Sequence, residues 1–233
     1  MARVTYLYHS GFMVETKNTC LVFDYYTDGG KINNIDINRF KDKNVFVFVS
    51  HFHQDHYDKE IFKWKDMNVR YVLSKDCKYD KNIENVTVVS PNKGYIIDGL
   101  AVETLKSTDE GVAFIVHADG LTIYHAGDLN WWHWEEESRA YNEMMKRNYQ
   151  YEIGKMEGQA IDVAFVPLDP RQEEQYYWGM DYFMKHTDTK VVFPMHMWGH
   201  YEVWERLMEN PEASSYRDKV MRITKAPQEF EIG

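Results

Sequence analysis

Short apolar runs separated by turn-forming residues predict a chain dominated by β-strands. Three such runs open the sequence, at residues 4–8, 12–15 and 19–24. Further strands are predicted at residues 45–49, 69–73, 86–90, 95–97, 100–105, 113–116, 121–125, 161–167, 191–194 and 219–224. The strands at 113–116 and 121–125 form a hairpin, because the Asp119-Gly120 pair between them is a strong hairpin turn signal.

Helical patterns fill the longer intervals between these strands. Asp58 is placed to cap a helix that contains Ile61, Phe62 and Trp64. One long helix or a helix pair is predicted over residues 135–158, with acidic residues in its first turn. Two more helices are predicted at residues 176–186 and 201–210.

The chain of 233 residues suits one domain, and we predict a single domain over residues 1–233. Hydrophobic residues make up 44% and charged residues 27%, as in a soluble globular protein. The formal net charge of −10 argues against a nucleic-acid partner, which a basic surface would serve. No apolar run is long enough to span a membrane, and the N-terminus does not resemble a signal peptide. With only two distant cysteines, we expect a cytoplasmic protein with free thiols.

Four metal-ligand side chains follow the apolar strand V-F-V-F-V within a few positions. These are His51, His53, Asp55 and His56, in the stretch H-F-H-Q-D-H. They leave the carboxyl end of a buried strand, which is where α/β sheets place ligand sites. Imidazole and carboxylate ligands suit Zn, Fe or Mn, and we expect one or two divalent ions, with Zn as first choice.

The hexapeptide resembles the H-x-H-x-D-H signature of the metallo-β-lactamase superfamily. Four more stretches resemble that superfamily, in its metal-dependent hydrolase branch that includes ascorbate-6-phosphate lactonase. They are H-S-G-F from His9, I-Y-H-A-G-D ending at Asp128, D-V-A-F-V-P in residues 162–167 and V-V-F-P-M-H ending at His196. The resemblance implies an α+β fold, a four-layer αββα sandwich with its metal site along one edge.

The resemblance also implies a ligand set. It gives one metal His51, His53 and a bridging Asp128, and the other metal Asp55, His56, Asp128 and His196. The family's third-motif histidine should fall near residues 106–108, where this chain has none. Asp109 is a candidate replacement ligand, since its carboxylate offers an oxygen. One metal, two metals with one held weakly, and a degenerate site all remain open.

Four more residues are candidates for the surroundings of the metals. His9 either supports the metal ligands or bonds to the backbone of its turn. Trp131, Trp132 and His133 follow Asp128 directly and are candidates for a substrate wall, because aromatic side chains line pockets. An aromatic wedge between helices is the alternative interpretation.

The predicted activity is hydrolysis of an ester, lactone, amide or phosphodiester in a small-molecule substrate. A metal ion lowers the pKa of bound water to about 7, which supplies a metal-bound hydroxide at neutral pH. Asp55 and Asp128 are the expected catalytic carboxylates, which orient the nucleophile or accept its proton. Two alternatives are a di-iron redox protein on the same fold and a non-catalytic ligand-binding domain with a partly lost metal site. The sequence does not indicate the oligomeric state.

Overall fold

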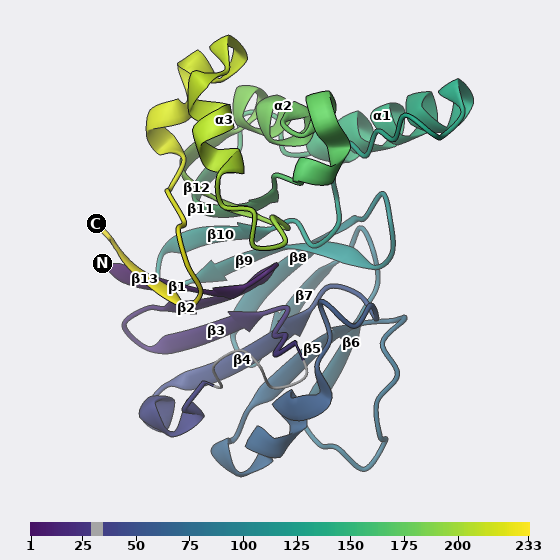
Figure 1. Cartoon of the computed structure of the whole chain (residues 1–233). Helices are drawn as coiled ribbons and strands as arrows, with labels where there is room; N and C mark the ends of the chain where they lie inside the picture. Colours follow the sequence, from purple (N-terminus) through teal and green to yellow (C-terminus); the bar gives the residue numbers. More distant parts are fainter. Residues whose placement is uncertain (29–34) are drawn as a thin grey trace.

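The computed structural model describes residues 1–28 and 35–233, which form two facing β-sheets with helices on their outer sides (Figure 1). In order across the first sheet, the strands are β13 (Gln228–Ile232), β1 (Ala2–Tyr8), β2 (Gly11–Glu15), β3 (Thr19–Phe23), β4 (Asn44–Val49), β5 (Arg70–Ser74) and β6 (Val86–Val89). In order across the second, they are β12 (Asp188–Met195), β11 (Ala160–Pro167), β10 (Leu121–His125), β9 (Val112–Ala118), β8 (Leu100–Lys106) and β7 (Gly94–Ile97). The predicted α+β sandwich is therefore confirmed.

The outer faces of the two sheets carry different helices. The second sheet is covered by α1 (Arg139–Gly154), α2 (Trp178–His186) and α3 (Val203–Glu209), at the top of Figure 1. The first sheet is covered by the 3-10 helices η1 (Ile37–Phe40) and η2 (Lys59–Met67). Three further 3-10 helices are η3 (Pro170–Gln175), η4 (Pro211–Ser215) and η5 (Arg217–Lys219). No helix in the described part of the chain is long and apolar enough to cross a membrane.

Strand β4 shows why the central apolar run is continuous. Phe46 and Phe48 face the core between the two sheets, while Val45, Val47 and Val49 face the layer that contains η1 and η2. Successive side chains of a strand point to opposite faces, so a strand that is buried on both faces is apolar throughout.

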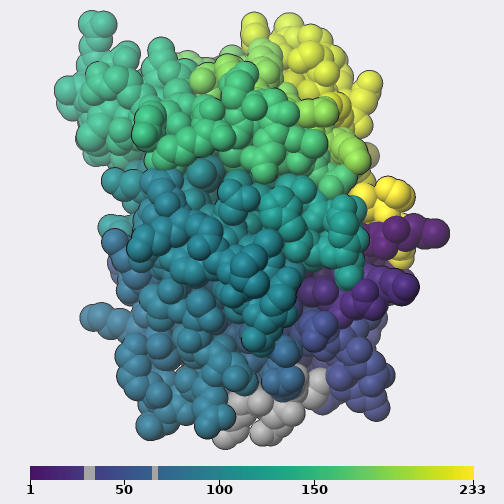
Figure 2. All heavy atoms as spheres, turned by 180° about the vertical axis from the view of Figure 1, so that it is seen from behind, coloured from purple at the N-terminus to yellow at the C-terminus, as the bar shows by residue number. Residues whose placement is uncertain are grey.

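The C-terminal end differs from the prediction in two ways. The strand predicted at residues 219–224 is wrong: η5 ends at Lys219, and Val220 makes only an isolated bridge to Val192. Burial of Val220 and Ile223 accounts for the apolar pattern that mimics a strand there. The last strand is β13, which pairs antiparallel with β1. The two ends of the chain therefore lie side by side, purple beside yellow in Figure 2.

The predicted helix over residues 135–158 is shorter in the structure. It begins at Arg139, because the Ser138 hydroxyl accepts a hydrogen bond from the Tyr141 amide and caps the first turn. Residues 135–137 precede the cap and so lie outside the helix. Asp58 caps a helix as predicted, but η2 is a 3-10 helix.

Candidate metal centre

The candidate metal centre lies at one edge of the sandwich, where strands of both sheets end. Strands β1, β3 and β4 run in one direction in the first sheet, and β10, β11 and β12 are parallel in the second. The residues that follow these strand ends include His9, Asp24, the 51–56 loop, Asp128, Asp169 and His196. The His196 amide donates a hydrogen bond of 3.1 Å to the His9 carbonyl, which joins the two sheets at this edge.

Asp24 anchors two of the predicted ligands. Its Oδ2 accepts hydrogen bonds from His56 Nδ1 at 2.7 Å and from the Ser50 hydroxyl at 2.6 Å. The Ser50 oxygen in turn lies 2.9 Å from His51 Nδ1. With Nδ1 of each imidazole engaged, the lone pair of Nε2 is free to bind a metal, as is usual for metal-ligating histidines.

His196 is held in the same way from the second sheet. Its Nδ1 lies 2.8 Å from Asp169 Oδ2, and both groups are buried. Burial opposes ionisation of Asp169, but hydrogen bonds from His196 and Arg171 outweigh it and lower the pKa of the carboxyl to about 2. Asp169 is therefore ionised at neutral pH and fixes the ring of His196.

Two groups of ligand atoms meet at this edge, each with its donor atoms within 4.8 Å of one another. The inner cluster consists of His9, Asp55, His56 and His196. The outer cluster consists of His51, His53, Asp109 and Asp128. A third grouping, Asp24 with His51 and His56, uses the anchoring carboxylate described above.

Asp128 lies between the two clusters. Its Oδ1 is 3.2 Å from His56 Nε2 and 3.6 Å from His196 Nε2, whereas its Oδ2 is 3.6 Å from His51 Nε2. The two oxygens of one carboxylate thus face different clusters, which is the arrangement of a bridging ligand. Burial, reinforced by neighbouring carboxylates, raises the pKa of Asp128 to about 7.

Unpaired buried atoms show that these residues fit divalent cations. Among the described residues, both ring nitrogens of His9, Nε2 of His56 and Oδ1 of Asp128 are buried without a hydrogen-bond partner. Buried polar atoms are normally paired, so unpaired imidazole and carboxylate atoms within these clusters fit the ligand set of a divalent cation. Burial also lowers the pKa of His51 to about 2 and that of His9 to about 4, so both rings are neutral, as metal binding requires.

Comparison with known proteins agrees with this geometry. A family model described as "Beta-lactamase superfamily domain" matches residues 3–196. The chain belongs to the metallo-β-lactamase superfamily. Within the superfamily it is similar to curated proteins named UPF0173 metal-dependent hydrolases.

The relatives differ in how much of their length they share with this metallo-β-lactamase-like chain. A relative in Thermococcus kodakarensis is 24% identical, over 91% of this chain and 90% of its own length. One in Korarchaeum cryptofilum is 29% identical, over 55% of this chain and only 60% of its own length. The solved structure of Igni18, a metallo hydrolase from Ignicoccus hospitalis, aligns with a TM-score of 0.64 and 18% identity, covering 100% of this chain and 99% of Igni18. At that identity the likeness to Igni18 shows the fold alone.

The departure from the superfamily pattern coincides with Asp109. The chain lacks the third-motif histidine, and the structure places Asp109 Oδ2 3.6 Å from His53 Nδ1 in the outer cluster. His9 is buried, and its Nε2 is 3.1 Å from Asp55 Oδ2, so the structure places His9 among the side chains of the inner cluster.

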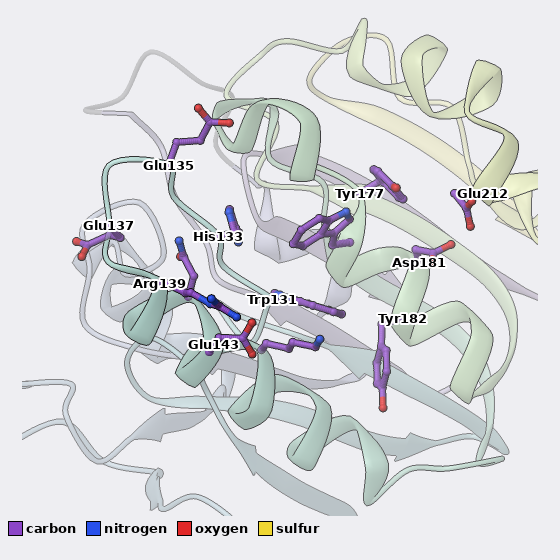
Figure 3. Close-up of a pocket in the computed structure, with 13 residues that line it drawn as sticks. Trp131, His133, Glu135, Glu137, Arg139, Glu143, Tyr177, Asp181, Tyr182 and Glu212 are labelled. Carbon is purple, nitrogen blue, oxygen red and sulfur yellow. The ribbon is translucent and has the colours of Figure 1, made fainter.

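The aromatic residues after Asp128 divide between two places. Trp132 lies at the metal centre: its indole donates to the Asp128 carbonyl at 3.0 Å, and its ring centroid is 5.5 Å from that of His196. Trp131 and His133 instead line a cavity of about 770 Å³ between α1 and α2 (Figure 3). Side chains of the 131–133 segment alternate in direction, so Trp132 faces the candidate metal centre while Trp131 and His133 face the cavity.

Four other histidines lie outside both clusters, and one of them, His186, has its Nδ1 2.8 Å from the Tyr182 carbonyl in α2. His125 is buried, with Nε2 2.9 Å from the Ser10 carbonyl, while Nδ1 accepts the Gly127 amide. His117 contacts Glu103 on an exposed strand face, and His200 is exposed beside Glu202.

Sequence reasoning did not include Asp24, Asp169 or Trp198 among the site residues. The Trp198 ring is 36% exposed, and its centroid lies 4.3 Å from that of His9 and 5.5 Å from that of His196. The two aspartates carry a signal that could have been used, because each follows a buried strand at the carboxyl edge where the ligands gather.

Proposed function

We propose that this protein hydrolyses a small-molecule ester, lactone, amide or phosphodiester with the help of divalent cations held in the two clusters. The observation that carries the proposal is the meeting of the clusters around Asp128, with unpaired buried donor atoms on both histidine and aspartate. The name that the curated relatives share, metal-dependent hydrolase, supports the same reaction class.

The ligand rings are oriented before any cation binds. Asp24 holds His56, Ser50 holds His51 and Asp169 holds His196 through Nδ1, so each Nε2 points to the centre. A divalent cation bound there would supply a Lewis acid and would lower the pKa of water, with zinc as the first candidate. Fixed donors of this kind need no rearrangement during the reaction.

Two carboxylates have different positions in this scheme. Asp55 is 25% exposed in its side chain, so it can meet water and substrate, and it is the residue we assign to orient the nucleophile. Asp128 is buried between the clusters, and its role is to hold both of them together.

Aromatic side chains flank the opening of the site. Phe52 is 47% exposed beside His53, with ring centroids 4.7 Å apart, and Trp198 lies over His9 on the other side. The Arg171 guanidinium lies 4.7 Å from the Trp198 ring centroid. The aromatic side chains at the opening favour a small-molecule substrate that has an apolar part.

The test is hydrolysis of nitrophenyl ester, lactone, nitroanilide and bis(nitrophenyl) phosphate probes by the zinc-loaded protein, compared with Asp128→Asn. We expect Asp128→Asn to lose at least about 10–100-fold in kcat/KM, because it removes the charge that both clusters share, and even loss of an outer partner of a metal ligand has that effect. Asp98→Asn is the control, since that exposed carboxylate pairs with Arg70 away from the site. Full activity in Asp128→Asn, or in chelator-treated protein, would contradict the mechanism, and bound iron with a visible absorption band would favour redox chemistry instead.

A further inference from the structure

The two clusters differ in the atoms that they offer a cation. The inner cluster has three imidazoles and one carboxylate, and its three histidines are buried. The outer cluster has two imidazoles and two carboxylates. In the outer cluster, the side chains of His53 and Asp109 are 39% and 43% exposed. Asp128 faces both clusters, so the inner position has more nitrogen donors and deeper burial, whereas the outer position has fewer nitrogen donors and greater exposure to water.

Asp109 is held in place by the loop that carries it. The Asp109 amide donates to the Ser107 hydroxyl at 3.1 Å, and the Thr108 hydroxyl donates to the Asn130 carbonyl at 2.7 Å. At the other end of the loop, the Val112 amide donates to the Ser50 carbonyl at 3.0 Å. The loop is thus tied to the segments that precede His51 and follow Asp128, which separates Asp109 from an ordinary surface carboxylate.

Gly111 shows how closely this loop approaches the ligand segment. A Cβ at Gly111 would lie 1.9 Å from the Ser50 carbonyl oxygen and 2.7 Å from His51 Cβ, and the residue has a φ of +72°. Only glycine fits such a position. The close approach packs the loop that carries Asp109 against the segment that carries His51.

We propose that the clusters are unequal cation sites: the inner one binds a zinc-class ion tightly, and the outer one, with Asp109 as a ligand, binds a harder manganese-class ion weakly and exchangeably. Imidazole favours zinc, whereas carboxylate and water favour manganese and magnesium. Burial of the three inner histidines slows release of the inner ion, while the greater exposure of His53 and Asp109 permits exchange at the outer cluster. The inference rests on the proposed metal-dependent function and makes that function responsive to the supply of the second cation.

Metal binding to the chelator-treated full chain tests this directly, by calorimetric titration and elemental analysis with Zn²⁺. Mn²⁺ is then added to the one-zinc protein, and its binding is followed by electron paramagnetic resonance. We expect one tight zinc equivalent and a separate manganese equivalent. Asp109→Asn should weaken the manganese equivalent by about 10–100-fold or more, since even loss of an outer partner has that effect, and should leave the first zinc equivalent unchanged.

Asp109→His converts the outer cluster to the donor set of the inner one. It should tighten the second zinc equivalent and weaken manganese binding. Glu110→His is the matched control: it adds an imidazole to the neighbouring exposed position, which lies outside the cluster, and should behave like the wild type. Thermal unfolding of each variant confirms that the fold is retained.

The inference fails if Asp109→Asn leaves manganese binding intact, if the two zinc equivalents of the wild type are indistinguishable, or if Glu110→His behaves as Asp109→His does. These outcomes are separate from the fate of the proposed function. Unequal binding without turnover of any probe would refute hydrolysis and uphold the inference, whereas turnover with two equivalent zinc sites would do the reverse.

Discussion

Replacing Gly111 by alanine tests whether the 107–111 loop is pressed against the ligand segment. Gly120 provides the matched control. Both glycines have positive φ values, +72° and +82°, but a Cβ at Gly120 meets no heavy atom within 4 Å. The two substitutions share the backbone strain and differ in the clash with Ser50 and His51.

The magnitudes follow from these contacts. A left-handed backbone costs an alanine about 1–2 kcal/mol in either variant. Forcing a methyl group into a packed position adds about 1–3 kcal/mol. We therefore expect Gly120→Ala to lose about 1–2 kcal/mol of unfolding free energy and Gly111→Ala about 2–5 kcal/mol. For a chain of this size, the difference lowers the melting temperature of Gly111→Ala by several degrees, at about 2–4 °C per kcal/mol.

Urea denaturation of the metal-free proteins, followed by tryptophan fluorescence, measures both losses. Equal losses in the two variants would refute the reasoning, because they would leave only backbone strain and no contact between Gly111 and Ser50. Gly111→Ala should also weaken cation binding to the outer cluster, because the clash displaces the loop that carries Asp109, whereas Gly120→Ala should leave that binding unchanged.

Three more predictions concern pH, the anchoring carboxylate and the metal. Hydrogen bonds from Thr16 and Asn18 outweigh burial and lower the pKa of Asp119 from 3.8 to about 2, so its stabilisation is complete above about pH 5 and is lost as pH falls through about 2. The difference in unfolding free energy between the wild type and Asp119→Asn should therefore be largest near pH 6 and should shrink as pH falls to about 2, and a constant difference would contradict this. Asp24→Asn should weaken cation binding to the inner cluster by about 10–100-fold, because Asp24 orients the His56 ring. Competition with a chromogenic chelator measures the affinity, and an unchanged value would mean that Asp24 does not support the site. In protein held with free zinc at 100 times its dissociation constant, removing the zinc with a chelator should lower the unfolding free energy by about 2.7 kcal/mol. Adding zinc back should restore the lost stability. An unchanged melting temperature would mean that the clusters bind no cation in the native state.

Four residues of the candidate metal centre could be predicted from the sequence because their chemistry is concentrated in one short stretch. A continuous apolar strand followed by His51, His53, Asp55 and His56 has few other physical explanations, and the structure brings all four to one edge. The same reasoning predicted the 118–121 hairpin, where Asp119 and Gly120 both have positive φ. Local patterns of this kind depend only on neighbours along the chain.

Contacts between the two sheets could not be derived from local sequence patterns, and only the family resemblance grouped residues of both sheets in one site. His9 and His196 are far apart in the chain, yet their ring centroids are 4.2 Å apart, because the end of β1 meets the end of β12 across the sandwich. The pairing of Asp169 with His196 likewise depends on the parallel register of β11 and β12, which no local pattern specifies. The prediction of a strand at 219–224 was wrong because the local pattern was apolar for another reason: Val220 is buried in the core without being part of a strand.

Backbone conformation at the strand ends explains why these ligands converge and why the sequence conceals it. His9, Asp24 and His196 have φ values of +54°, +42° and +64°, a region that non-glycine residues rarely enter. Each follows a strand directed at the metal centre, and the left-handed turn redirects the chain there. Such conformations cost about 1–3 kcal/mol each and persist only where surrounding contacts enforce them. Here the contacts are the buried hydrogen bonds of Asp24 with Ser50 and of His196 with His9. Because the strain and the ligand atoms occupy the same residues, the fold holds the donors in position before a cation arrives, at the expense of local stability.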